Sequence, residues 1–185
     1  IFIKPGTVHA AEGGILVAEV QESSDMTFRL YDWGRENNPA TARKMHLEEA
    51  IDLINYDRYD ASDYMPAGSE KSEDGVEYPL VSCPQFSVSK LDLKAALRIS
   101  PEHYGSYLVY ICTSGAAAIN VPKRPVQDDS KAAAAFGTPE MDIYPIRKGD
   151  TVLVPADMPD FYLVPTLPGT ELIVAADGVR EDNDE

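Results

Sequence analysis

Cysteine is scarce in this 185-residue sequence, which contains only Cys83 and Cys112. Their spacing matches neither a disulfide framework nor a metal-binding motif of paired cysteines. Both residues lie in apolar stretches. We therefore expect two buried, reduced thiols, and we place the protein in the cytoplasm, where thiols stay reduced.

Basic residues are also few. The chain has 16 Lys and Arg against 31 Asp and Glu, which gives a formal net charge of −15. Because nucleic-acid-binding proteins need a basic surface, this composition argues against a nucleic-acid partner. It also means that any site for a phosphorylated ligand must be local and basic.

Long hydrophobic runs are missing as well. No apolar run approaches the roughly 18 residues that a membrane-spanning helix requires, so we expect no membrane span. The sequence has no glycine-rich phosphate loop, nucleophile elbow or CxxC motif, which disfavours kinases, serine hydrolases and thiol redox enzymes. Apolar residues still make up 44% of the chain, enough for a globular protein with one large or two small domains.

The most informative pattern lies in residues 1–33. The turn PGTVHA carries His9, and the segments ILVAEVQ and SDMTFRLYD that follow are expected to form two strands. Because strand side chains alternate between faces, Glu19 and Gln21 share one face of the first strand, while Arg29 lies on the polar face of the second. Polar faces of this kind are typical of the lining of a small barrel that holds a polar ligand.

The rest of the chain is expected to contain one helix, a linker and many short strands. Apolar residues at helical spacing predict a short helix within 47–56, and a polar stretch rich in Gly, Pro and Ser predicts a linker or long loop over 57–76. The β-rich runs beyond it favour an antiparallel sandwich or barrel. These runs are 78–83, 86–93, 106–113, 116–121, 141–146, 151–154, 161–164 and 171–175, with a hairpin loop at 122–139 and an acidic, disordered tail after 178.

The motifs PGTVHA, a glycine pair, ILVAEVQ, SDxTxRLYD and RxxHxxxAIDLI follow one another in an order and spacing that resembles the zinc-dependent type I mannose-6-phosphate isomerases. That family is built on cupin (jelly-roll) barrels, so the resemblance implies a mainly β fold. The implied domains are the closing strands of a metal-binding cupin with its helix (1–56), a linker (57–76), a second cupin (77–178) and an acidic tail (179–185). A weak internal repeat sets Asp160 where His9 lies, so we expect the second cupin to be metal-free.

The resemblance also implies roles for individual residues. His9 would be a zinc ligand, Arg29 a catalytic residue, and Glu19 an active-site residue beside the metal. The chemistry agrees for Arg29, because aldose–ketose isomerisation passes through an enediolate whose negative oxygen needs a fixed cation. The alternative for Arg29 is a simple ion pair with Glu19 or Asp25.

Three roles are open to Glu19: proton transfer, orientation of a metal ligand, or an ion pair with Arg29. Gln21 shares its face and could donate a hydrogen bond to the substrate. Arg35, in the loop YDWGR, could bind the phosphate of a sugar phosphate, or it could be a solvated loop charge. His46 and His103 have no partner at metal-ligand spacing and are expected to be structural.

The resembled family takes its other zinc ligands from an upstream segment with a QVHPDD-like motif and a glutamate, and neither is in this sequence. We therefore expect the C-terminal part of a longer isomerase that interconverts mannose 6-phosphate and fructose 6-phosphate, with the missing N-terminal half as its partner. By itself the chain is expected to be inactive and to bind zinc weakly. The competing hypotheses are a non-catalytic cupin that binds sugars or serves as a scaffold, and a different cupin sugar isomerase.

Overall fold

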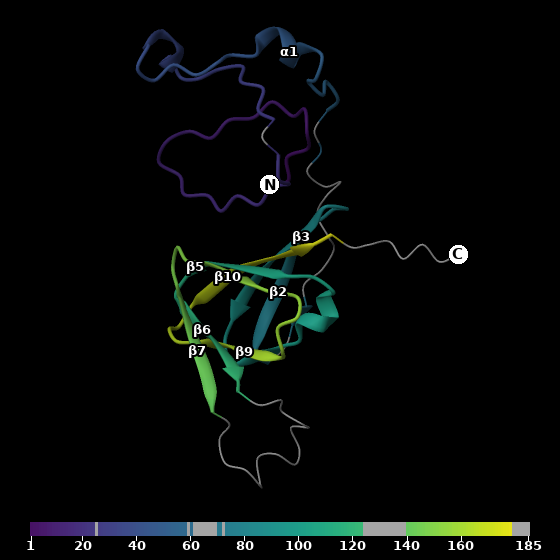
Figure 1. The fold of residues 1–185 in the computed structure, drawn as a ribbon, viewed down its shortest axis with the longest axis vertical. Coiled ribbons are helices and arrows are strands. Elements are labelled where there is room, and N and C mark those ends of the chain that lie inside the picture. Colours follow the sequence, from purple (N-terminus) through teal and green to yellow (C-terminus); the bar gives the residue numbers. More distant parts are fainter. Residues whose placement is uncertain (25, 59, 61–69, 72, 124–139, 179–185) are drawn as a thin grey trace, which may run out of the picture. The chain divides into compact units, whose positions relative to one another are not determined.

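The computed structural model describes residues 1–24, 26–58, 60, 70–71, 73–123 and 140–178 (Figure 1). The chain divides into two compact units, unit 1 (Ile1–Asp63) and unit 2 (Tyr64–Glu185). Four features of the sequence analysis lie wholly or mostly outside the described residues: Asp25, most of the 57–76 linker, most of the 122–139 loop, and the 179–185 tail.

Unit 2 consists of two antiparallel sheets, so the expected mainly β fold is confirmed (Figure 1). One sheet has the strand order β1-β2-β3-β10-β5-β8 and the other has the order β4-β9-β6-β7. The strands are β1 (Glu70–Lys71), β2 (Gly75–Ser82), β3 (Phe86–Leu93), β4 (Leu97–Ile99), β5 (Leu108–Ser114), β6 (Ala116–Pro122), β7 (Met141–Arg147), β8 (Thr151–Val154), β9 (Phe161–Pro165) and β10 (Thr170–Asp177). A short 3-10 helix, η3 (Pro101–Tyr104), lies between β4 and β5.

The core of unit 2 is built from strand residues of alternating burial. Along β5, Leu108, Tyr110 and Cys112 are buried and the residues between them are half-buried, as period-two alternation requires. Phe161 and Leu163 of β9, in the other sheet, are fully buried in the same cluster. The rings of Tyr110 and Phe161 meet edge to face with centroids 6.3 Å apart. This cluster joins residues of the two sheets into one core.

The observed strands of unit 2 agree closely with the sequence prediction, with two additions. β3 and β8 have the predicted bounds, and other strands differ at their ends. β4 was not anticipated because only three residues pair, antiparallel to β9. β1 was not anticipated because its two residues lie inside the stretch that we read as linker. Both cysteines are free thiols as expected, although only Cys112 is fully buried and Cys83 is half-buried.

In the described part of unit 1 there is one short α-helix, α1 (Leu47–Ile51), one 3-10 helix, η1 (Arg35–Asn37), and no strand. The prediction of strands over ILVAEVQ and SDMTFRLYD is therefore wrong for this structure. A strand needs a hydrogen-bonded neighbour, and a lone two-stranded hairpin is marginal in water. The apolar side chains of these segments gain little burial, since Leu16 is 90% exposed and Met26 is 73% exposed. Across the described residues, no helix combines the length and the apolar character needed to cross a membrane.

Candidate functional site

A tight turn at Asp32–Arg35 builds the centre of the candidate site in unit 1. The Arg35 N–H donates to the Asp32 carbonyl at 3.0 Å. The two residues between them, Trp33 (φ 56°) and Gly34 (φ 77°), are both left-handed. This conformation suits glycine but is unusual for a bulky residue such as Trp33. The turn folds the Arg35 side chain back toward Asp32.

The Asp32 carboxylate is surrounded by three arginines, and only 1% of its side chain is exposed. Arg35 Nη2 donates to Oδ1 at 2.7 Å. Arg43 grips the carboxylate with two donors, Nε to Oδ2 at 2.9 Å and Nη2 to Oδ1. Arg29 Nε lies 4.0 Å from Oδ1. We call these four residues the arginine cluster; three guanidinium groups and one carboxylate give it a formal charge of +2.

The electrostatics of the cluster keep its members ionised. The hydrogen bond from Arg43 lowers the pKa of Asp32 below its ordinary value, the charges of Arg35 and Arg29 act in the same direction, and burial opposes them. The same hydrogen bond raises the pKa of Arg43. Charge-assisted, bidentate pairs of this kind hold both partners in a defined geometry.

Arg29 is fixed at both its backbone and its side chain. The backbone N–H of Arg29 donates to His46 Nδ1 at 3.1 Å, and the backbone N–H of His46 donates to the Arg29 carbonyl at 2.9 Å. Its guanidinium donates through Nη1 to the Lys44 carbonyl at 3.2 Å. The acid beside Arg29 is therefore Asp32 and not Glu19, and His46 has the structural role that we expected.

His9 lies exposed in the PGTVHA turn, where its Nδ1 is 2.8 Å from the Thr7 carbonyl. If Nδ1 carries the proton and donates to that carbonyl, Nε2 is left for a metal ion, as in many metal-bound histidines. However, the described residues contain no group of three or more His, Cys, Asp and Glu that could hold a metal ion. His9 thus fits one zinc ligand, and the described part of the chain does not complete a zinc site.

Glu19 and Gln21 are both exposed. Within the described part of the chain, the structure shows no hydrogen bond or ion pair between either residue and the arginine cluster. Of the five residues singled out from the sequence, the structure brings Arg29 and Arg35 together. It shows no hydrogen bond or ion pair from His9, Glu19 or Gln21 to Arg29 or Arg35.

The sequence analysis missed two members of the cluster, Asp32 and Arg43. A signal for Asp32 was present, because it lies three residues after Arg29 and three before Arg35 in the motif RLYDWGR. Arg43 follows Asp32 by eleven residues. No local spacing rule connects such positions, so only the folded chain shows that they meet.

Asp160 in unit 2, set against His9 by the internal repeat, has a different environment. Its carboxylate accepts hydrogen bonds from Arg98, with distances of 2.8 Å from Nη2 and 3.1 Å from Nε. The hydrogen bond from Arg98, followed by one from Ser100, lowers the pKa of Asp160. The position therefore carries an ion pair that links β4 to the residue preceding β9.

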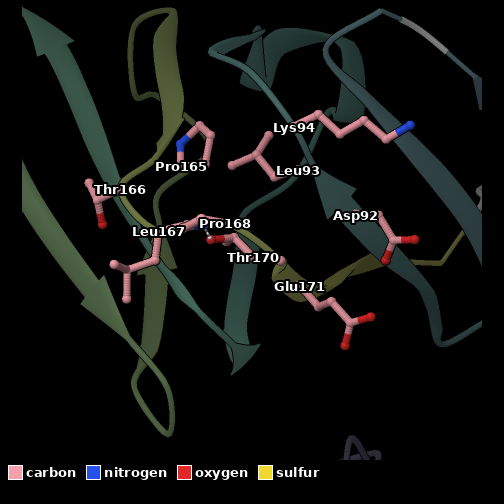
Figure 2. Close-up of a pocket in the computed structure, with 10 residues that line it drawn as sticks. Asp92, Leu93, Lys94, Pro165, Thr166, Leu167, Pro168, Thr170 and Glu171 are labelled. Atoms are coloured by element: carbon pink, nitrogen blue, oxygen red, sulfur yellow. Dashed lines mark hydrogen bonds between the residues drawn. The ribbon is translucent and has the colours of Figure 1, made fainter.

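A groove of about 720 Å³ opens on unit 2, between the end of β3, the turn before β10 and the start of β10 (Figure 2). Two carboxylates on its wall, Asp92 and Glu171, are paired with Lys90 at 2.8 and 3.4 Å. Below the turn, the buried Thr170 hydroxyl lies 2.7 Å from the Leu167 carbonyl. These contacts brace the sheet and the turn, so we assign the groove a structural role.

No family model matches the chain. Among curated proteins, mannose-6-phosphate isomerase ManA of Bacillus subtilis is 28% identical over 162 residues, which is 88% of this chain and 44% of the relative. Among solved structures, the mannose 6-phosphate isomerase of Bacillus subtilis has a TM-score of 0.61 at 22% identity, covering 82% of this chain and 40% of that one. An RmlC-like cupin from Shewanella frigidimarina matches with a TM-score of 0.43 at 17% identity, over 62% of this chain and 86% of that one. The chain spans less than half the length of the curated relatives that it matches.

Proposed function

We propose that this chain, which is homologous to the mannose-6-phosphate isomerases, forms the C-terminal part of a cytoplasmic enzyme that interconverts mannose 6-phosphate and fructose 6-phosphate. The reaction moves a proton between neighbouring carbons through an enediolate. The similarity extends over 88% of the chain for one relative and 83% for another. The partner in this proposal is the N-terminal half of the same protein.

Within the candidate site, one observation supports the proposal most: the contacts that hold Arg29 in place. Its guanidinium is fixed by the Lys44 carbonyl and lies beside the buried Asp32. Its side chain is 20% exposed, so Arg29 is not sealed inside unit 1. A preorganised cation of this kind suits an enediolate oxygen, because it needs little rearrangement when the negative charge develops.

The other sequence-derived residues complete the proposal. Arg35 would bind the phosphate of the substrate, since its side chain is 48% exposed and belongs to a cluster with excess positive charge. Glu19 would transfer the proton, and Gln21 would bind a sugar hydroxyl. His9 would supply one zinc ligand through Nε2, with further ligands from outside the described residues. When bound, zinc would polarise sugar oxygens.

The test uses the full-length gene product that contains this chain. Zinc content is measured by elemental analysis, and isomerase activity is measured by coupling fructose 6-phosphate formation to a reporter enzyme. Arg29→Ala should lower turnover by about 100-fold or more, because one charged stabiliser of the transition state is removed, while zinc content stays normal.

Arg98→Gln is a matched control, because it removes an arginine–aspartate pair in unit 2. It should leave turnover unchanged. A full-length protein that binds zinc but shows no turnover would favour the non-catalytic sugar-binding cupin. Loss of zinc in Arg29→Ala would give Arg29 a structural role instead.

A further inference from the structure

We propose that the arginine cluster is a dianion-binding site in which Arg43 acts with Arg35 on a phosphoryl group and Asp32 is the positioning residue. The identity of the ligand, a phosphorylated sugar, rests on the proposed function. The geometry of the site does not depend on that function, because it is set by contacts within the described residues of unit 1.

The charge of the cluster matches a phosphate monoester. Three guanidinium groups face one carboxylate, which leaves a formal charge of +2. The whole chain carries a net charge of −15, so a local concentration of positive charge is needed before a dianion can bind. Arginine is also the residue whose planar fork of donors best fits phosphate oxygens.

The hydrogen bonds within the cluster leave donors free for a ligand. Arg35 uses Nε on the Asp32 carbonyl and Nη2 on the Asp32 carboxylate, and Arg43 uses Nε and Nη2 on the same carboxylate. A guanidinium has five N–H groups, so three on each arginine remain for a ligand. The two side chains are 48% and 46% exposed, so nearly half of each side-chain surface remains open to solvent.

Asp32 holds the three arginines in place, and its own negative charge lowers the positive charge of the cluster. Three guanidinium groups would otherwise repel one another, and a single buried carboxylate holds them around one point. If Asp32 only reduced the charge, its neutralisation would strengthen anion binding. If Asp32 positions the arginines, its neutralisation should weaken anion binding although the cluster gains charge. The two roles thus predict opposite signs.

The experiment titrates this chain with inorganic phosphate, sulfate, mannose 6-phosphate and mannose. Isothermal titration calorimetry measures binding, and the emission of Trp33 gives a second signal, because Trp33 is the only tryptophan and lies in the turn between Asp32 and Arg35. We expect saturable binding of phosphate, sulfate and mannose 6-phosphate but not of mannose. Absence of saturable binding by all three anions, or equal binding of mannose and mannose 6-phosphate, would overturn the proposal.

Substitutions then separate positioning from charge. Arg43→Gln should weaken phosphate binding by about tenfold, the effect of losing a charge-assisted hydrogen bond. Arg43→Lys keeps the charge but loses the fork, and should weaken binding by a similar factor. Asp32→Asn should also weaken it by about tenfold. Unchanged binding in Arg43→Lys would rule out a role for the guanidinium fork of Arg43, and tighter binding in a folded Asp32→Asn protein would rule out the positioning role of Asp32.

Two further variants and a fallback complete the design. Arg98→Gln and Asp160→Asn break the corresponding arginine–aspartate pair in unit 2 and should leave phosphate binding unchanged.

If Asp32→Asn does not fold, Arg43→Lys still tests whether the geometry of the arginine donors, and not their charge alone, governs anion binding. Because the assay needs neither zinc nor turnover, phosphate binding by this chain together with a full-length protein that has no isomerase activity would contradict the proposed function only. An active full-length enzyme whose KM for mannose 6-phosphate is unaffected by Arg43→Lys would contradict the dianion site only.

Discussion

Asp32 links the stability of unit 1 to pH. Its hydrogen bond from Arg43 lowers its pKa in the folded chain below the ordinary value of 3.8. A carboxylate with a depressed folded pKa contributes stability that is fully present above the unfolded pKa and is lost as the pH falls through the folded pKa. We therefore expect unit 1 to lose structure below about pH 4, and the emission of Trp33 measured along an acid titration checks this.

An Asp32→Asn protein provides the control for that acid transition. Because the amide does not titrate, any acid-induced change in Trp33 emission that depends on Asp32 should be absent from the variant. An unchanged acid transition in Asp32→Asn would show that other carboxylates control the order of unit 1.

Thr170 illustrates a single residue with a large structural effect in unit 2. Only 1% of it is exposed; its hydroxyl lies within hydrogen-bonding distance of the Leu167 and Ala116 carbonyls and accepts a hydrogen bond from the Ala116 N–H. Thr170→Val keeps the shape but removes the hydrogen bonds of this buried hydroxyl, so the free energy of unfolding should fall by about 1–3 kcal/mol. Urea unfolding followed by far-UV circular dichroism measures it. Thr151→Val, at an exposed strand position, should be nearly neutral.

At the residue scale, the sequence identified two of the three cations of the site, Arg29 and Arg35, but neither Arg43 nor the carboxylate that holds them. Arg29 and Arg35 stand out because positive charge is scarce and because each follows a recognisable motif. The two carboxylates weighed as partners of Arg29 were Glu19 and Asp25, yet the observed partner is Asp32. Arg43 lies eleven positions after Asp32 and contacts it because the chain folds back between them, and the spacing of apolar and polar residues does not predict that fold.

Among the elements of unit 1, the turn that carries His9 depends on Gly6. Gly6 has φ +82°, and a Cβ at this position would lie 2.7 Å from the Leu53 carbonyl oxygen. The Gly6 carbonyl also accepts a hydrogen bond from the Asn55 N–H at 2.8 Å, which ties the turn to the segment after α1. Gly6→Ala should therefore cost at least about 1–2 kcal/mol, the penalty of a left-handed alanine alone.

Gly13→Ala is the matched control for the Gly6 substitution, because nothing lies within 4 Å of a Cβ at Gly13 and its φ is not positive. Urea titrations followed by Trp33 emission compare the two proteins. Equal midpoints for the two variants would show that the Gly6 turn does not support unit 1.

Strands could be predicted where each has a neighbour to pair with. In unit 2, alternating β-rich runs coincide with paired strands, because burial on one face and ladder hydrogen bonds agree. In unit 1, ILVAEVQ alternates equally well but forms no ladder in the structure. Alternation shows that a segment suits a sheet; pairing decides whether it becomes a strand, and a lone hairpin is marginal.

On the scale of the whole molecule, the two units carry different spectroscopic signals. The only tryptophan, Trp33, lies in unit 1, while the sheets described by the structure lie in unit 2. A chain with two compact units need not unfold in one step, so a single melting temperature need not describe it. Tryptophan emission and far-UV circular dichroism should therefore be recorded together.

Phe161→Ala tests whether the two units unfold separately. Phe161 is fully buried in the core of unit 2 and packs edge to face against Tyr110. Truncating such a ring leaves a cavity and should lower the free energy of unfolding of unit 2 by about 3–5 kcal/mol. We expect the circular dichroism transition to move to lower urea while the Trp33 transition stays in place. An equal shift of both transitions would show that the chain unfolds as one cooperative body.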